Sequence, residues 1–249
     1  MNKLKLFELF YNYAVSNIIT DFTRKQCEQF EIYYEELIEW NKMFNLISFK
    51  SENDLIYRHF CDSLYGAKAI KEEVSSTNKL EVADLGTGSG LPGIPVKIAI
   101  PEIKLTLIES ITKKCKFLEN VNKKLGFSIE ILNERAEEVG QNADHRQKYD
   151  IVLSRAVSKF SPNLEISIPL LKIGGYFIVY KTKNSAQSKE EGIPSIENAL
   201  RHLGAKLEHV MPYNLPEQNL DYCILIFKKY KDTPMQFPRK PGIPEKKPL

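Results

Sequence analysis

Hydrophobic positions along the chain follow two different patterns, and the change between them divides the sequence. Up to about residue 75 the apolar residues recur at helical spacing, with no alternation of strands and helices. From residue 80 to 227 short apolar runs alternate with amphipathic stretches, as strands and helices do in α/β proteins. We therefore expect an N-terminal helical segment at 1–75, an α/β domain at 76–230 and a tail at 231–249.

The α/β part predicts a doubly wound, mostly parallel seven-stranded sheet with helices on both faces. The last two strands should pair as an antiparallel edge, and residues 133–138 and 172–175 should be a loop and a turn. Lys113, Lys114 and Lys116 should form a basic flank that faces solvent. The expected strands are 80–85, 103–108, 129–132, 149–153, 176–180, 206–211 and 222–227, and the expected helices are 94–100, 112–125, 164–171 and 195–203.

The N-terminal segment carries two signals of its own. Thr23 and Gln26 form a capping-box pattern at the start of a helix that should run to about residue 42 and pack its aromatic face on the main domain. A later helix places His59 and Asp62 three residues apart, so that both point to one side. His59 and Asp62 are interpreted as a capped or buried polar pair. The alternative is that Arg58 and His59 border the mouth of an active site.

A glycine-rich loop follows the first expected strand. Glycines stand at 86, 88, 90 and 93, and a helix with a proline in its first turn begins directly after them. Glycine allows positive φ and close approach to a ligand, while the start of a helix directs free N–H groups at it. Strand, glycine loop and helix in this order predict the first half of a βαβ nucleotide site.

Two ligands compete for this loop. Gly88, Gly90 and Gly93 satisfy the dinucleotide fingerprint G-x-G-x-x-G, with Glu109 about 20 residues further on. Read from Asp84, the loop resembles the first motif of S-adenosylmethionine-dependent methyltransferases. The second interpretation is favoured because Gly88 lies three residues beyond the strand. An acid at the strand end also suits a donor with an amino group and a sulfonium, and would repel a pyrophosphate.

The carboxyl ends of parallel strands meet at one edge of an open sheet, where ligands bind close to the point at which strand order reverses. Four of the expected strands end there in residues with suitable chemistry. We interpret the residues at these strand ends as a binding site for the methyl donor. Glu109 would accept hydrogen bonds from the ribose hydroxyls, and the adenine would lie near Ala136. The four strand ends offer Asp84 with the glycine loop, Glu109, Ala136 with Glu137, and Ser154 with Arg155.

The composition indicates in which cellular compartment the protein works. No apolar run among the 249 residues approaches the ~18–20 residues of a membrane span, and the first residues lack the core and cleavage site of a signal peptide. The four cysteines are far apart and never form a C-x-x-C pair, which argues against zinc and against a disulfide framework. We expect a cytoplasmic protein with free thiols and no metal.

The end of the chain is basic. Residues 228–249 hold seven Lys or Arg and two Asp or Glu, a net +5, which leaves −2 for the remainder because the chain totals +3. Prolines at 234, 238, 241, 244 and 248 disfavour helix and sheet. This tail is interpreted as a solvated segment or as an extended strap suited to phosphates, with Arg239 and Lys240 among its basic residues.

The end of the fourth strand narrows the chemistry. Methyltransferases that act on exocyclic amines often carry Asn/Asp-Pro-Pro-aromatic there, whereas this chain has Ser154-Arg155-Ala156-Val157. Methylation of a pyrimidine carbon requires a cysteine nucleophile, and no cysteine stands at these strand ends. A purine ring nitrogen attacks the methyl group with its own lone pair, so the enzyme mainly holds both reactants in line.

These motifs together resemble the ribosomal RNA small subunit methyltransferase G family, also called glucose-inhibited division protein B. The likeness covers nearly the whole chain, and the Leu91-Pro92-Gly93-Ile94-Pro95 extension of the glycine loop is more specific than the glycines alone. Glu109-Ser110 replaces the Asp-Ser that often stands in the family, which keeps the carboxylate. The other matching segments are 40–46, 58–63, 84–90, 135–138, 154–156 and 238–248.

The resemblance implies transfer of a methyl group from S-adenosylmethionine to N7 of one guanine in small-subunit (16S) rRNA, near the decoding region. It places Gly86, Leu91, Ala136, Glu137 and Arg155 on the donor. The strand-end interpretation adds Asp84, Gly88 and Glu109 to the donor site. Arg155 and Lys181 would lie near the target base or its phosphates. Arg58, His59 and the tail, with Arg239 and Lys240, would contact rRNA. The partner would be the small ribosomal subunit or its precursor, and the protein would act as a monomer.

Two other functions remain open. A nicotinamide-dependent oxidoreductase would use the dinucleotide fingerprint, and NAD rather than S-adenosylhomocysteine would raise its melting temperature. A non-catalytic RNA-binding factor would keep the fold without the donor. It would bind RNA with steep salt dependence and have no donor affinity.

Overall fold

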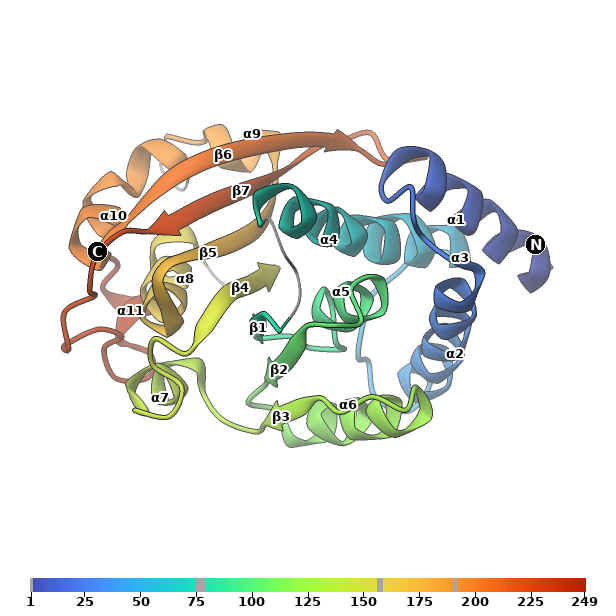
Figure 1. Cartoon of the computed structure of the whole chain (residues 1–249), viewed down its shortest axis with the longest axis horizontal. Helices are drawn as coiled ribbons and strands as arrows, with labels where there is room; N and C mark the ends of the chain where they lie inside the picture. Colours follow the sequence, from blue (N-terminus) through green and yellow to red (C-terminus); the bar gives the residue numbers. More distant parts are fainter. Residues whose placement is uncertain (1, 75–78, 156–158, 190–191) are drawn as a thin grey trace.

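The computed structural model describes residues 2–74, 79–155, 159–189 and 192–249 (Figure 1). Seven strands form one sheet in the order β3-β2-β1-β4-β5-β7-β6, and the first five are parallel to one another. The strands are β1 Glu81–Leu85, β2 Lys104–Ile108, β3 Glu130–Leu132, β4 Tyr149–Arg155, β5 Leu171–Thr182, β6 Ala205–Asn214 and β7 Asp221–Lys229.

The expected doubly wound fold is confirmed, including the antiparallel pairing of β6 with β7. The chain runs outward from β1 to β2 and β3, then returns to place β4 on the other side of β1. The carboxyl ends of β1 and β4 therefore mark the reversal of strand order, where α/β sheets bind ligands. The sequence did not indicate which of the last two strands borders β5; in the structure β7 inserts between β5 and β6 and runs antiparallel to both.

Helices cover both faces of the sheet because side chains alternate along each strand. In β4, Ile151 and Leu153 join the core on one face, and Val152 joins the core on the other. The helices on the first face are α1 Lys3–Asn17, α2 Arg24–Asn41, α4 Asp62–Glu73, α5 Gly93–Ala99 and α6 Thr112–Lys124. Those on the second are α7 Ala136–Gln141, α8 Phe160–Ser167 and α10 Glu197–Leu203.

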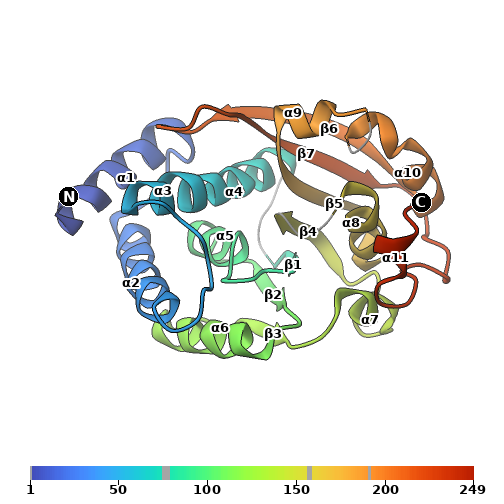
Figure 2. The same ribbon diagram turned by 180° about the vertical axis from the view of Figure 1, so that it is seen from behind.

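The two termini lie at opposite ends of the molecule (Figures 1 and 2). Several short helical elements connect the longer helices and strands. Residues Ile56–Cys61 form a π-helix that joins α3 to α4, a local widening that the sequence pattern did not predict. The short helical elements are α3 Glu52–Leu55, α9 Lys183–Gln187, α11 Ile243–Lys246 and the 3₁₀ turns Ile168–Leu170 and Ile193–Ser195.

The N-terminal helices are fastened to the part of the fold that bears the glycine loop. The predicted capping box of Thr23 and Gln26 is present at the start of α2. The amide of Gln26 also donates to the carbonyl of Ile98, 2.8 Å away at the end of α5. Buried Tyr33 donates its hydroxyl to the carbonyl of Ser89, 2.5 Å away in the glycine loop. The helical segment thus supports the loop from behind.

Two local predictions are wrong. Residues 133–138 were expected to be a loop, but α7 begins at Ala136. This helix has only six residues, which is too short to show a helical period in the sequence. Residues 172–175 were expected to be a turn, yet they belong to β5. Gly174 there has a φ of +88°, and the pairing of β4 with β5 shifts between Tyr149 and Ile151, as in a β-bulge.

The tail is also not the extended solvent-exposed strap that its prolines indicated. Arg239 donates from its Nε and Nη2 to Glu165 on α8, at 2.8 and 2.6 Å, and the Glu165 side chain is 0% exposed. Removing one partner of such a buried pair costs about 3–5 kcal/mol. The tail therefore packs on the fold, with Phe237 in the second core and α11 against α8.

The described residues contain no helix with the length and apolar character needed to cross a membrane. Within the same residues, no three His, Cys, Asp or Glu side chains lie together as a metal site would require.

Candidate functional site

The glycine loop adopts the conformation that its composition predicts. Gly86, Gly88 and Gly90 have φ values of +65°, +60° and +90°, which side-chain-bearing residues rarely adopt. A Cβ at Gly93 would lie 2.8 Å from the carboxylate of Asp84 and 2.7 Å from Leu107, so glycine is also required there by close packing. The loop can fold tightly against β1 and β2 because these side chains are missing.

Asp84 holds this loop from within. Its Oδ2 accepts a hydrogen bond from the hydroxyl of Thr87 at 2.5 Å and another from the N–H of Gly93 at 2.8 Å. The residue is 0% exposed, and its Oδ1 has no hydrogen-bond partner among the described residues. Burial raises the pKa of Asp84 to about 6. Asp84 thus fixes the shape of the loop and does not line a cavity.

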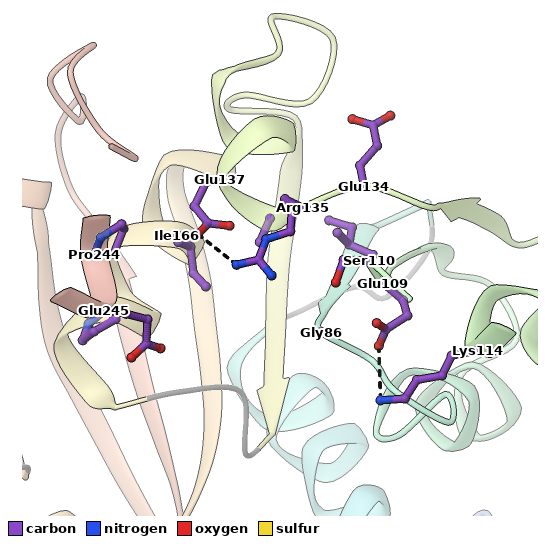
Figure 3. Close-up of a pocket in the computed structure, with 13 residues that line it drawn as sticks. Gly86, Glu109, Ser110, Lys114, Glu134, Arg135, Glu137, Ile166, Pro244 and Glu245 are labelled. Carbon is purple, nitrogen blue, oxygen red and sulfur yellow. Dashed lines mark hydrogen bonds and ion pairs between the residues drawn. The ribbon is translucent and has the colours of Figure 1, made fainter. Parts of the chain in front are cut away.

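A cavity lies in front of the loop, at the carboxyl ends of β1, β2 and β3 (Figure 3). We name it the donor cavity, after the ligand that the sequence predicts there. Its volume of about 310 Å³ is at the low end of the range for small-molecule sites. Polar side chains of both signs line it together with apolar surface. The lining residues are Gly86, Ile108, Glu109, Ser110, Lys114, Glu134, Arg135, Ala136, Glu137, Pro162, Ile166, Pro244 and Glu245.

Glu109 is held rigidly at the end of β2. Its Oε1 accepts from the N–H of Ile111 at 2.8 Å and its Oε2 from the N–H of Gly88 at 3.0 Å, while the Lys114 ammonium lies 3.9 Å from Oε2 (Figure 3). An acid at this position holds the ribose hydroxyls in related nucleotide-binding folds. The bonds to backbone N–H groups connect Glu109 to the glycine loop, so the two parts of the site are positioned together.

The first turn of α7 supplies the next wall. Glu137 is 6% exposed, and its Oε1 lies 3.4 Å from Nη2 of Arg135 and 3.1 Å from the N–H of Gly242, both of which donate to it. Gly86 leaves the floor of the cavity free of a side chain, and four of the residues that line the rest are acids. A ligand that combines an adenosine with a cationic sulfonium fits this lining, because the carboxylates complement both the hydroxyls and the positive charge.

The acceptor cavity, the name we give to a second hollow of about 330 Å³, lies at the carboxyl ends of β4 and β5. Tyr180 forms part of its wall and donates its hydroxyl to the carbonyl of Ser63 at 2.9 Å. A Cβ at Gly66 would lie 1.8 Å from the Tyr180 hydroxyl, so α4 needs glycine to admit this ring. The lining residues are Arg58, His59, Asp62, Arg155, Tyr180, Lys181, Thr182, Ser185 and Tyr222.

Arg155 is clamped at the end of β4 by residues of the N-terminal segment. Its Nη1 donates to Oδ2 of Asp62 at 3.0 Å and to the carbonyl of Arg58 at 3.3 Å, and its Nη2 lies 3.0 Å from Nδ1 of His59. The hydroxyl of Tyr213 donates to the other oxygen of Asp62 at 2.5 Å. The guanidinium is thus fixed in position in the wall of the cavity.

The geometry determines the tautomer of His59. A guanidinium can only donate, so Nδ1 of His59 accepts from Arg155, and Nε2 carries the proton that it donates to the carbonyl of Ser48 at 3.2 Å. Burial and the Arg155 charge lower the pKa of His59 to about 3. His59 is therefore neutral at pH 7 and positions Arg155, and the expected contact of His59 with rRNA stays a prediction that would involve an uncharged ring.

The structure separates the predicted site residues into groups. Gly86, Glu109, Ala136 and Glu137 line the donor cavity, while Arg155 lines the acceptor cavity with Arg58, His59 and Lys181. Asp84, Gly88 and Leu91 shape the glycine loop behind the donor cavity. Arg239 is paired with Glu165, and Lys240 is exposed on the tail. Ala156 and Val157, also named from the sequence, lie outside the described residues.

Several lining residues were missed from the sequence. Lys114 was expected on a solvent-facing flank but its side chain is 24% exposed and reaches toward Glu109. Pro244 and Glu245 come from a tail whose docking site was unknown. One signal for that docking was present, because Glu165 is an acid within an apolar stretch and a buried acid requires a partner. Tyr222 carried no comparable signal.

The sheet order, the glycine loop and the carboxylate at the end of β2 define the class: this is a Rossmann-like S-adenosylmethionine-dependent methyltransferase. A solved structure supports the fold, although at 12% identity it shows the fold alone. The Burkholderia thailandensis 1,6-didemethyltoxoflavin-N1-methyltransferase, with bound 1,6-didemethyltoxoflavin and S-adenosylhomocysteine, superimposes with a TM-score of 0.53 over 83% of this chain and 87% of its own.

The sequence comparisons show the family. The model of the family described as rRNA small subunit methyltransferase G matches residues 26–212. The protein named ribosomal RNA small subunit methyltransferase G from Lachnoclostridium phytofermentans is 40% identical over 92% of both chains. Its namesake from Desulforamulus reducens is 41% identical over 95% of both. The chain therefore belongs to the rRNA small subunit methyltransferase G family, which removes the oxidoreductase alternative.

Proposed function

We propose that this protein transfers a methyl group from S-adenosylmethionine to N7 of a guanine in small-subunit rRNA. The observation that carries the proposal is the pair of cavities at the carboxyl edge of the sheet. The donor cavity lies over β1, β2 and β3, and the acceptor cavity lies over β4 and β5. Because β1 and β4 are neighbours, two reactants bound in these cavities would meet where strand order reverses.

On the donor side, Glu109 would accept hydrogen bonds from the ribose hydroxyls, and Gly86 would let the ligand approach the backbone closely. Ala136 and Glu137 would bound the adenine end. S-adenosylmethionine supplies an electrophilic methyl group on a sulfonium. The task of Asp84, Gly88 and Leu91 is to hold the loop, and with it the ligand, in one position.

On the acceptor side, Arg155 would orient the target base through N–H groups held at fixed directions by Asp62 and His59. Tyr222 is half-buried, stacks on Tyr213 at a centroid distance of 5.7 Å and offers an aromatic surface to an unstacked base. Arg58 and Lys181 lie in the wall of the cavity, where they would meet phosphates of the flanking nucleotides.

The reaction requires no base. The N7 lone pair of guanine forms the new bond to carbon while the sulfonium keeps the electrons of the bond that breaks, so no proton moves. The product base carries a positive charge, and the Asp62 carboxylate in the same cavity would stabilise it as it develops. Neutral His59, with its Nδ1 occupied by Arg155, has a positioning role in this scheme.

The assignments extend to the cell and the partner. The reaction would take place in the cytoplasm, with the small ribosomal subunit or its precursor as substrate and the protein acting as a monomer. Lys240 remains the tail residue proposed to contact rRNA, since its side chain is exposed. The pairing of Arg239 with Glu165 makes a structural role the better interpretation of that residue.

The test is methyl transfer from labelled S-adenosylmethionine to small subunits that lack the modification, followed by nucleoside analysis. We expect the label in 7-methylguanosine, and its loss in Gly86→Asp. Label in another nucleoside would overturn the guanine assignment. RNA binding with steep salt dependence but without affinity for S-adenosylhomocysteine would instead support the non-catalytic RNA-binding factor.

A further inference from the structure

The C-terminal segment, which we define as residues 238–249, is anchored on α7 and α8. Arg239 donates to the fully buried Glu165 of α8 and, through Nη2, to the carbonyl of Lys247 at 2.7 Å. This second bond folds the segment back on itself around α11. At the end of the chain, the hydroxyl of Ser161 lies 3.2 Å from the Leu249 carbonyl, to which it donates. The segment is thus fixed at both of its ends.

Its start is held just as closely. A Cβ at Gly140 of α7 would lie 2.6 Å from Pro238, so the absence of a side chain allows the segment to pack on this helix. The amide of Gln141 donates to the carbonyl of Pro238 at 2.5 Å, and the guanidinium of Arg146 donates to the carbonyl of Phe237 at 2.6 Å. These contacts place the following residues, 242–245, at a defined position beside the donor cavity.

The middle of the segment contributes directly to that cavity. The N–H of Gly242 donates to Oε1 of Glu137 at 3.1 Å, so the segment holds one of the expected donor-binding carboxylates. Pro244 is buried and lines the cavity with Glu245 (Figure 3). In that view, the two residues lie across the cavity from Glu109 and Lys114. The segment therefore forms the wall farthest from the expected ribose position.

The carboxylates that line the cavity differ in what they already bind. Glu109 accepts from two backbone N–H groups, and Glu137 accepts from Arg135 and Gly242. The side chain of Glu134 points away from the cavity in Figure 3. Glu245 is directed inward and has no hydrogen-bond or ion-pair partner among the described residues. All of its acceptor capacity is therefore available to a ligand, whereas that of Glu109 and Glu137 is partly used.

We propose that the C-terminal segment completes the donor site, and that the Glu245 carboxylate accepts a hydrogen bond from the exocyclic amine of the donor's adenine. This inference rests on the proposed function and adds a residue to its donor site. Adenine has flat apolar faces and an amine that can only donate, so it requires apolar walls and an acceptor at its edge. The apolar walls are Ile108, Ala136, Pro162, Ile166 and Pro244.

The experiment is equilibrium binding of two ligands to the purified full-length protein by titration calorimetry. One ligand is S-adenosylhomocysteine, and the other is S-inosylhomocysteine, in which a carbonyl oxygen replaces the amine. The variants are Glu245→Ala and, as the matched control, Glu119→Ala, which removes an exposed glutamate of α6 that does not line the cavity. Both side chains are exposed, so neither substitution is expected to disturb folding.

We expect the unmodified protein to bind S-adenosylhomocysteine at least about tenfold more tightly than S-inosylhomocysteine, since hydrogen bonds to charged groups reach this strength. Glu245→Ala should weaken binding of the adenosine ligand about tenfold and abolish the discrimination. Glu119→Ala should change the affinity for either ligand by no more than about twofold.

Two results would overturn the inference while leaving methyl transfer intact. One is a Glu245→Ala protein that binds S-adenosylhomocysteine as tightly as the unmodified protein. The other is weaker binding with the discrimination preserved, which would mean that Glu245 does not contact the amine. A failure of the unmodified protein to bind S-adenosylhomocysteine would overturn the donor site itself, and this inference with it. The readout is affinity, so it does not depend on the reaction.

Discussion

The donor cavity and the acceptor cavity share one edge of the sheet but are built in different ways. The donor cavity takes its shape from backbone: three glycines with positive φ, and N–H groups that bind Asp84 and Glu109. The acceptor cavity takes its shape from side chains that converge on Arg155 from the N-terminal segment. We infer that the first is a general adenosine site, whereas the second carries the choice of substrate.

The difference also appears in the ionisable side chains that support each cavity. A carboxyl group with a raised pKa, Asp84, supports the donor cavity, and an imidazole with a lowered pKa, His59, supports the acceptor cavity. The contributions of Asp84 and His59 to stability should therefore depend on pH in opposite directions. Asp84 positions the glycine loop, and His59 positions the guanidinium of Arg155. We expect the loop and the guanidinium, and not the two buried groups, to contact the reactants.

The largest expected effect comes from filling the donor cavity. Gly86→Asp should lower the affinity for S-adenosylhomocysteine by about 100-fold or more, because a side chain would occupy the cavity floor. Gly126→Asp is the matched control, since Gly126 has a φ of +66° against +65° for Gly86 and nothing lies within 4 Å of its Cβ position. Titration calorimetry should show less than a twofold change for the control, and an equal loss in both would contradict the assignment of the cavity.

Asp84 should make the donor side less stable as pH rises. Its pKa is about 6 in the folded protein against 3.8 as the ordinary value, so the folded state holds a proton that the unfolded chain has released. The free energy of unfolding should thus fall by about 1.4 kcal/mol per pH unit from pH 4 to 6. Denaturant titrations of Asp84→Asn should show this contribution missing, and an unchanged pH dependence would show that Asp84 ionises normally.

His59 should act in the opposite sense on the acceptor side. Its pKa of about 3 lies below the ordinary 6.5, so between these pH values the unfolded chain binds a proton that the folded protein does not bind. This contribution to stability is complete above about pH 6.5 and is lost, by about 1.4 kcal/mol per unit, as pH falls toward 3. Imidazole ¹⁵N shifts should report a neutral ring with the proton on Nε2 at pH 5. A ring that titrates near 6.5 would contradict the clamp on Arg155.

The smallest effects should come from the rim of the acceptor cavity. Arg58→Ala and Lys181→Ala should each weaken RNA binding several-fold and reduce the slope of log affinity against log salt by about 1, as expected for one phosphate contact. Lys5→Ala is a charge-matched control, since Lys5 is exposed near the N-terminus. Fluorescence anisotropy with a fragment of small-subunit rRNA measures both quantities, and an equal change in the control would mean that only net charge matters.

The donor side could be predicted from the sequence because its parts are local. The spacing of the glycines and the order of strand, loop and helix place Gly86 and Glu109 at neighbouring strand ends, and the structure brings both to one cavity. The helix at Ala136–Gln141 was missed because six residues do not display a helical period. Its first residues nevertheless lie where the strand-end interpretation put Ala136 and Glu137.

The acceptor side could be predicted only in part because its residues are far apart in the chain. The three-residue spacing indicated that His59 and Asp62 share a side, but not that both would bind Arg155, 93 or more positions later. Tyr222 reaches the cavity because β7 inserts beside β5, and pairing of sequence neighbours did not indicate this. The tail was misjudged because proline content disfavours regular structure without saying where a segment docks.

The most direct test of the division between the two cavities is the substitution Arg155→Lys. A lysine cannot bind Asp62 and His59 in the fork geometry of the guanidinium. The measurement is the dissociation constant for S-adenosylhomocysteine together with the single-turnover rate of methyl transfer to small subunits. We predict an affinity within about threefold of the unmodified protein and a rate about 100-fold lower, as for the loss of one oriented donor. An affinity that falls as far as the rate would contradict this account and place Arg155 in the donor site.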